Sequence, residues 1–122
     1  MNDMYAEDKK FLKEINAGTS ALVLLSVVGF ASRPIYGYQI AKLIDSISSG
    51  VPMMKQGALY PVLRSLEKSG LLRSTIEPSV TGPPRRYYSV TEDGRAALER
   101  WTAIWSANKS FVDSVLKGIR YE

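Results

Sequence analysis

The amino-acid sequence predicts a mainly α-helical domain of the α+β class, a winged helix-turn-helix with an N-terminal and a long C-terminal dimerisation helix. Three observations predict this fold. Apolar residues recur at helical spacing in three segments between residues 19 and 70. Two segments rich in β-branched and aromatic residues then flank a stretch rich in proline and glycine, and a long helical pattern follows. The 122 residues can bury one ordinary core, so we expect a single domain.

The beginning of the chain divides into a charged segment and an apolar one. Residues 5–16 carry a helical stripe of apolar side chains among many charges, which predicts a helix that packs on another surface. Gly18 is expected to interrupt this helix. A densely apolar helix then begins with Thr19 or Ser20 as its N-cap, because a hydroxyl at that position accepts from a free backbone amide. Pro34 lies beyond its end, since proline cannot continue a helix.

The next two helical patterns form the helix-turn-helix pair. Residues 35–50 place isoleucine and leucine at helical spacing, and residues 57–70 do the same with leucine and valine on one face and charged residues on another. Gly70 is suited to a left-handed C-cap. Pro61 is expected in the first turn of its helix, where its missing amide costs little. The second of these helices is therefore amphipathic.

A change of period after Gly70 predicts a β-hairpin and a last helix. Residues 71–76 and 85–90 read as strands, and residues 77–84, EPSVTGPP, as a turn or flexible loop between them. Thr91 is followed by two acidic residues and is expected to cap the last helix. In a module of this order the third helix lies in the DNA major groove, and the hairpin, or wing, reaches an adjacent groove or the backbone.

Composition excludes several classes of protein. The chain contains no cysteine and no histidine, which removes thiol nucleophiles, disulfides, imidazole bases and nearly every structural zinc site. No pair of carboxylates lies in an apolar setting that would raise the pKa of one of them, so an enzyme is the poorest interpretation and neither metal nor cofactor is expected. A net charge of +4 and a pI near 9.4 suit a polyanionic partner, although many soluble domains are mildly basic.

The longest apolar run, residues 21–31, is too short to span a membrane. The charges that precede it are mixed, whereas a signal peptide has a basic lead-in. We therefore expect a cytoplasmic protein that makes no contact with a membrane.

Three segments resemble the PadR-like transcriptional regulators. They are IYGYQIAKLI at residues 35–44, GALYPVLRSLEKSGLL at residues 57–72 and GPPRRYYSVTEDG at residues 82–94. Their order and spacing carry the resemblance, which extends from Gly18 to about Trp105. The short part of the chain after the winged module is similar to the smaller subfamily, which has a single C-terminal helix.

The resemblance implies a homodimeric DNA-binding regulator, commonly a repressor, whose DNA affinity is altered by a small hydrophobic or aromatic compound. The implied site includes Tyr36 and Tyr38 at the start of the second helix, and Tyr87 on the returning wing strand. Two positions depart from the family pattern. Ser65 stands where an arginine is usual, and Ala58 where threonine is frequent, which leaves the details of operator contact open.

The third helix and the wing supply the side chains expected at double-stranded DNA. The first part of a recognition helix reaches base edges, while lysine and arginine neutralise phosphates. The residues expected to contact DNA are Tyr36, Tyr38, Lys42, Lys55, Gln56, Tyr60, Arg64, Arg85 and Arg86. A solvated polar face is the alternative for each of them, and burial is a second alternative for Tyr60. Paired cations beside a Gly-Pro-Pro loop suit phosphate or minor-groove binding, so at least one of Arg85 and Arg86 is expected to act there. Alternation sends the two to opposite faces of a strand, so only one of them is expected to reach DNA.

The last helix is expected to form the dimer seam. Its apolar residues repeat at steps of three and four, with Asn108 as an interruption. The seam comprises Leu98, Trp101, Trp105, Val112, Val115 and Ile119, widened by Ile104 and Phe111. The alternative is a helix folded on its own core. Homodimerisation suits a palindromic operator, because two recognition helices then read sites about one DNA turn apart.

Trp101 and Trp105 could line a pocket for a flat apolar effector, although aromatic residues at helical spacing are more often ordinary core. The resemblance favours the pocket, since Trp101 matches a tryptophan that lines the central cavity of relatives. The expected organisation is an N-terminal helix at residues 1–17 that contacts the dimer, a winged domain at 18–92 and a dimerisation helix at 93–122. A winged module that binds protein or RNA without operator specificity is the competing interpretation.

Overall fold

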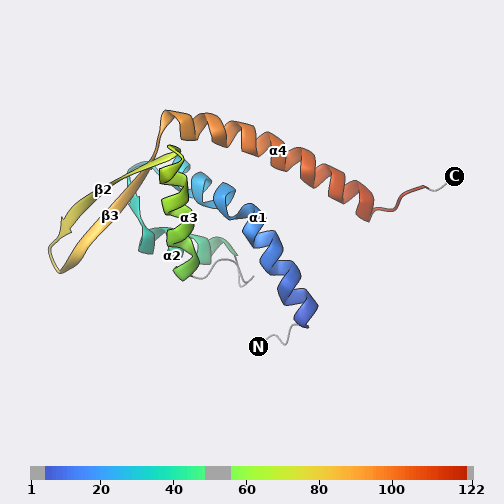
Figure 1. Cartoon of the computed structure of the whole chain (residues 1–122), viewed down its shortest axis with the longest axis horizontal. Coiled ribbons are helices and arrows are strands. Elements are labelled where there is room, and N and C mark those ends of the chain that lie inside the picture. The colour runs from blue at the N-terminus through green and yellow to red at the C-terminus, as the bar shows by residue number, and fades with distance from the viewer. Residues whose placement is uncertain (1–4, 49–55, 121–122) are drawn as a thin grey trace.

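A computed structural model describes residues 5–48 and 56–120 of the chain (Figure 1). The elements, in order, are α1 (Ala6–Phe30), β1 (Ile35–Tyr36), α2 (Gly37–Ser48), α3 (Gln56–Lys68), β2 (Leu72–Ser79), β3 (Gly82–Val90) and α4 (Glu92–Leu116). The strands form one antiparallel sheet in the order β1-β3-β2. This arrangement of helices and hairpin is a winged helix, which confirms the predicted fold class.

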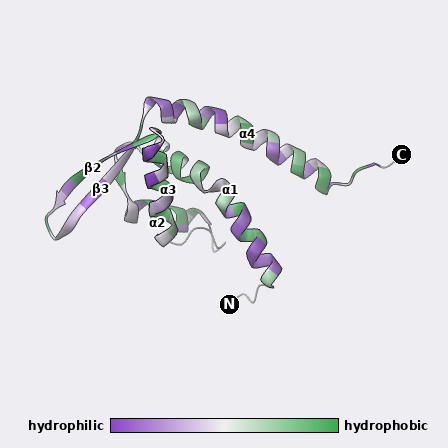
Figure 2. Cartoon of the chain, in the orientation of Figure 1, coloured by the Kyte–Doolittle hydropathy of each residue, from purple (hydrophilic) through white to green (hydrophobic). Residues whose placement is uncertain are grey.

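The core lies where α1, α2 and α3 meet the base of the hairpin and the first turns of α4 (Figure 1). Figure 2 shows α1 as hydrophilic toward its N-terminus and hydrophobic toward the core. Leucine and isoleucine supply most of the buried surface. The core residues are Leu24, Leu25, Val28, Ile40, Ile44, Leu59, Leu63, Leu66, Leu72, Tyr88, Val90 and Ala97. Burial of these side chains is the main source of stability, because the free energy gained grows with the apolar area removed from water.

The expectation that Gly18 interrupts the first helix is wrong, because α1 runs without a break from Ala6 to Phe30. The Thr19 hydroxyl donates to the Ile15 carbonyl at 2.9 Å and so acts as an interior helical residue. A single glycine costs a helix about 1 kcal/mol, less than packing on the core supplies. The predicted boundary between residues 17 and 18 therefore falls inside one helix.

Because α1 is longer than expected, its apolar part is also longer than the sequence suggested. By length and composition alone the helix could cross a membrane, whereas the sequence suggested a run confined to residues 21–31. Its most apolar half packs in the domain. Leu24 and Leu25 are fully buried and Val28 is 3% exposed, so this half is a core helix of the winged module.

The sheet differs from the prediction in two places. Residues Ile35 and Tyr36, expected to be helical, form β1 and pair with Tyr88 and Tyr87 of β3. The expectation of a loop over residues 77–84 is wrong, because β2 extends to Ser79 and β3 already begins at Gly82. Prolines are tolerated there since each strand has only one neighbour toward the tip, and the register shifts beside Pro78.

Pro61 is the sixth residue of α3, in its second turn, so the expectation that it lies in the first turn is wrong. The helix begins at Gln56, earlier than the sequence pattern indicated. Proline cannot donate to the carbonyl of Gly57, four residues before it. Both residues are exposed, so water can satisfy that carbonyl.

The end of α3 and the start of α4 are joined by hydrogen bonds, which we call the Thr91 junction. Gly70 has a φ of +82° and closes α3 as predicted. Its amide donates to the backbone carbonyl of Glu67, and the Leu71 amide donates to the Leu66 carbonyl. The Thr91 hydroxyl donates to the Gly70 carbonyl (2.6 Å) and accepts from the Gly94 amide (3.0 Å). This second bond is the predicted N-cap of α4.

Gly94→Ala should unfold more easily than the parent protein, because a Cβ at this position would lie 2.7 Å from Cγ2 of Val90 and would also meet the Leu71 carbonyl. We expect a loss of about 2 kcal/mol in the free energy of unfolding, as for an overpacked core. Gly18→Ala is the matched control. Its Cβ would meet nothing within 4 Å, so this helical glycine should gain about 1 kcal/mol. Urea denaturation at one protein concentration measures both, and equal effects would contradict the packing described here.

Candidate DNA-binding surface

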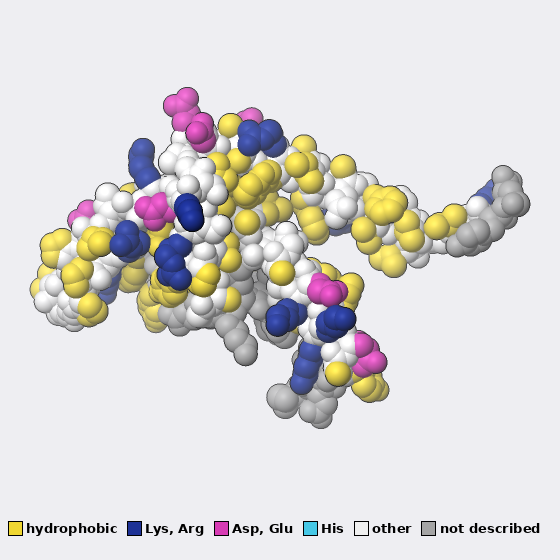
Figure 3. Space-filling model, in the orientation of Figure 1, with side chains coloured by type: hydrophobic (Ala, Val, Ile, Leu, Met, Phe, Trp, Pro, Cys, Tyr) yellow, Lys and Arg dark blue, Asp and Glu magenta, His cyan; other side chains and the backbone are white. Residues whose placement is uncertain are grey.

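Helix α3, which the sequence predicts to be the recognition helix, is held on the core by one face and exposes the other. Leu59, Leu63 and Leu66 are buried, whereas Arg64 is exposed on the outer side of the same helix. Figure 3 shows Lys and Arg side chains over α3 and the base of the hairpin. Of the polar residues predicted at the start of α3, Gln56 is its first residue, and Lys55 lies outside the described residues.

Tyr60 is half-buried between α3 and α2. A Cβ placed on Gly37 would lie 2.6 Å from Cε1 of the Tyr60 ring, so the glycine is needed for this close approach. The ring also packs against the buried core. Tyr60 therefore sets the contact between the two helices of the helix-turn-helix, and a role in DNA binding stays a prediction.

One face of the hairpin carries a cluster of two tyrosines and an arginine. The Arg85 guanidinium lies 4.5 Å from the centre of the Tyr36 ring, a cation–π arrangement. Tyr36 also meets Tyr87 edge-on, with 5.2 Å between ring centres. Nearby on α2, the Lys42 ammonium lies 5.6 Å from the Tyr38 ring, and both side chains are exposed. The contacts of Tyr36 therefore join β1 to one face of the wing, whereas the contact of Lys42 with Tyr38 lies within α2.

Arg86 lies on the opposite face of the hairpin from Arg85, as alternation along a strand predicts. Its Nη1 donates to the Ser74 hydroxyl at 2.8 Å, and Ser74 donates in turn to Oε2 of Glu67 on α3 at 2.7 Å. Ser74 was not among the predicted site residues. Its place depends on the register of β2 on β3, in which Ser74 pairs with Tyr88, and no local pattern gives that register.

Tyr88 is buried beside this group, and burial raises the pKa of its hydroxyl above the ordinary tyrosine value. The positive charges of Arg86 and Arg64 act in the opposite direction, and the Glu67 carboxylate adds to the effect of burial. Burial is the largest cause, so Tyr88 stays protonated and neutral near pH 7. The charged side chains of Arg86, Arg64 and Glu67 thus lie near a neutral core residue.

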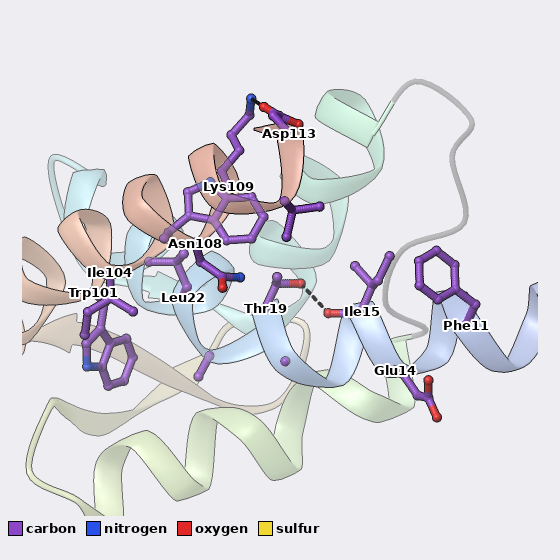
Figure 4. Close-up of a pocket in the computed structure, with 14 residues that line it drawn as sticks. Phe11, Glu14, Ile15, Thr19, Leu22, Trp101, Ile104, Asn108, Lys109 and Asp113 are labelled. Carbon is purple, nitrogen blue, oxygen red and sulfur yellow. Dashed lines mark hydrogen bonds and ion pairs between the residues drawn. The ribbon is translucent and has the colours of Figure 1, made fainter. Parts of the chain in front are cut away.

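A second candidate site lies between α1 and α4, in an open groove of about 750 Å³. Figure 4 shows Trp101 and Ile104 of α4 beside Leu22 and Thr19 of α1. Its lining is largely apolar and includes both tryptophans of the chain, Trp101 and Trp105, which the sequence analysis assigned to an effector pocket. No group of three acidic residues among the described residues could hold a metal ion.

The predicted dimer seam of α4 divides into two parts. Leu98 and Trp101 pack against the core of their own domain, and a Cβ on Gly29 would lie 3.2 Å from Leu98. The rest of the seam is exposed. Its exposed residues are Ile104 at 65%, Trp105 at 41%, Phe111 at 66%, Val112 at 42%, Val115 at 42% and Ile119 at 52%. The first part of the seam therefore belongs to the domain itself, and the second lies uncovered.

Known proteins match this chain in sequence and in structure. The family model described as the transcriptional regulator PadR-like family matches residues 24–100. A PadR family transcriptional regulator from Eggerthella lenta DSM 2243 is 29% identical, with a TM-score of 0.73 over 91% of this chain and 93% of that chain. A PadR-like transcriptional regulator from Bacillus cereus strain ATCC 14579 is 25% identical, with a TM-score of 0.70 over 87% of this chain and 99% of that chain.

A relative without a described function matches as well. An uncharacterized protein of Lysinibacillus sphaericus is 29% identical over 84 residues, which are 69% of this chain and 77% of that protein. The family match covers more than half of this chain, from the last two turns of α1 through the wing to the beginning of α4. The chain therefore belongs to the PadR-like family of transcriptional regulators.

Proposed function

We propose that this regulator is a homodimeric repressor that binds a palindromic operator in double-stranded DNA through α3 and the wing. The observation that carries the proposal is the exposure of Arg64, Arg85 and Arg86 on the two elements that a winged helix presents to DNA. Arginine binds phosphate through a planar fork and reads guanine in the major groove. Occupation of a promoter by the dimer would then block transcription in the cytoplasm.

The uncovered part of the α4 seam supports the homodimer. Its apolar side chains, Phe111 and Val112 among them, are exposed in the single chain. A run of exposed apolar residues on one helix favours a partner surface, because covering it removes apolar area from water. A second copy offers the same stripe, and a twofold pair of winged domains matches a palindromic operator.

The groove between α1 and α4 supports an effector that is small and apolar. Trp101 and Trp105 provide flat surfaces on which an aromatic compound can stack. The Thr91 junction fixes the start of α4 to the end of α3. A compound that favours one angle of α4 would therefore also favour one position of the recognition helix, which would change the affinity for DNA.

Selection of duplexes from a random-sequence library, followed by fluorescence anisotropy, tests the DNA-binding proposal. The expected result is enrichment of a palindrome that binds at least about a thousandfold more tightly than its scrambled sequence. Equal, weak and steeply salt-dependent binding to both duplexes would contradict operator recognition and favour a module that binds protein or RNA.

Arg64→Ala should weaken binding to the selected duplex about tenfold or more, since a base or phosphate contact of arginine contributes about 1–3 kcal/mol. If the contact is to a phosphate, the salt slope should also fall by about one. Arg100→Ala is the control, because it removes the same charge from an exposed position on α4. Equal losses in the two variants would show that only net charge matters.

Val112→Asp should shift the protein from dimer to monomer in sedimentation velocity, because a carboxylate placed in an apolar seam must be desolvated. Val112 is 42% exposed and no core residue, so the variant should keep its fold by circular dichroism. Ser110→Asp adds the same charge two residues away, toward the other side of α4, and should leave the dimer intact. A dimeric Val112→Asp protein would rule out this seam.

An aromatic compound that binds in the groove should quench the intrinsic tryptophan fluorescence, since both tryptophans of the chain line that groove. Titration of a panel of planar aromatic compounds measures the binding. For a compound that quenches, Trp105→Ala should lower the binding affinity about fivefold or more, because a stacked ring contributes about 1 kcal/mol beyond its buried area. Unchanged affinity in this variant would place the compound elsewhere.

A further inference from the structure

Three side chains form a hydrogen-bonded series between the recognition helix and the wing, which we call the Glu67 series. The Arg86 guanidinium on β3 donates to the Ser74 hydroxyl on β2, which donates to the Glu67 carboxylate on α3. Arg86 pairs with Ile76 in the register, so Ser74 is its diagonal neighbour on the same face of the sheet. Diagonal neighbours are within reach of a long side chain. The series therefore joins three elements through one hydroxyl.

Glu67 occupies a position that helix electrostatics disfavours. It is the second-last residue of α3, where the free carbonyls give the helix end a partial negative charge. A carboxylate there is repelled, whereas Lys68 beside it has the favoured sign. The Glu67 side chain is also only half-exposed. The hydrogen bond from Ser74 and the nearby guanidinium of Arg86 offset this repulsion. These contacts therefore hold the Glu67 carboxylate at a position that the helix end disfavours.

The Ser74 hydroxyl separates the two charges. Among the described residues the ion pair is Lys109 with Asp113, so Arg86 and Glu67 meet through Ser74 and not directly. A direct bidentate pair would occupy the guanidinium fork, whereas the present bond occupies one of its five N–H groups. Arg86 is exposed, so its remaining donors can reach a ligand. The arginine is thus oriented without losing its capacity to bind an anion.

We propose that Glu67 and Ser74 are positioning residues for DNA binding, which hold the Arg86 guanidinium at the junction of α3 and the wing to receive a backbone phosphate. Ordering a free arginine side chain on binding costs conformational entropy of up to about 2 kcal/mol. An arginine already held by Ser74 has lost part of that freedom before DNA arrives. The acidic residue therefore strengthens the binding of an anionic ligand.

The direction in which Glu67→Ala changes the DNA affinity distinguishes a positioning role from a simple effect of charge. Glu67→Ala removes a negative charge next to DNA, so electrostatics alone would tighten binding. The positioning role requires weaker binding, by about fivefold for the loss of one ordering hydrogen bond. Glu77→Ala is the control, because Glu77 is an exposed carboxylate on the wing that pairs with Arg85 in the register and takes no part in the bonds of Ser74 and Arg86. It should bind DNA as tightly as the parent or more tightly.

Ser74 supplies the second test. Ser74→Ala should weaken binding to the selected duplex about fivefold and leave the salt slope unchanged, because the Arg86 charge is retained. Ser74→Thr keeps the hydroxyl and should restore the affinity to within about twofold. Arg86→Ala should lower the salt slope by about one, the value for one phosphate contact. In the Arg86→Ala background, Ser74→Ala should have no further effect on DNA affinity.

This inference rests on the proposed function, and the two can fail separately. If the parent protein enriches no duplex from the library, operator binding fails and the positioning role fails with it. If the parent binds its duplex but Glu67→Ala binds more tightly, as Glu77→Ala does, only the positioning role is overturned. A Ser74→Ala effect that persists without Arg86 would also overturn it, because the serine would then act on the fold and not through the arginine. Urea denaturation of each variant gives the corresponding change in stability.

Discussion

The Thr91 junction is the constraint on which the arrangement of this protein depends. One hydroxyl donates to the Gly70 carbonyl at the end of α3 and accepts from the Gly94 amide at the start of α4. The Thr91 amide also donates to the Leu71 carbonyl, just before β2. The recognition helix, the base of the wing and the long last helix are therefore fixed to one another within a few residues. Gly94 permits this because no larger residue fits against the Leu71 carbonyl.

Much of the fold was predictable from local sequence. Gly70 and Thr91 acted as the cap residues that their chemistry indicates, and the apolar spacing of Leu59, Leu63 and Leu66 gave the buried face of α3. The errors arose where tertiary contacts override local preference. Gly18 stays helical because the C-terminal part of α1 packs on the core and outweighs the cost of one glycine. Strand β1 forms because β3 lies beside it.

The candidate site was predictable in the type of its residues and not in their contacts. Sequence identified Arg85 and Arg86 and the alternation that separates them, because strand periodicity is local. It could not give the partner of either arginine. The stack of Arg85 on Tyr36 depends on β1, and the bond of Arg86 to Ser74 depends on the hairpin register. Leu98 likewise matched a seam by spacing, yet it packs beside Gly29.

The two sides of the hairpin are held near its base, and its tip is free of the domain. Val80 at the tip is completely exposed, whereas Ser74 and Arg85, which contact α3 and β1, lie further from the tip. Lengthening a surface loop costs little free energy, because the closure entropy grows only slowly with length. The tip of the wing can therefore gain or lose residues without disturbing the core. Evolution could thus change the reach of the wing while the helix-turn-helix stays the same.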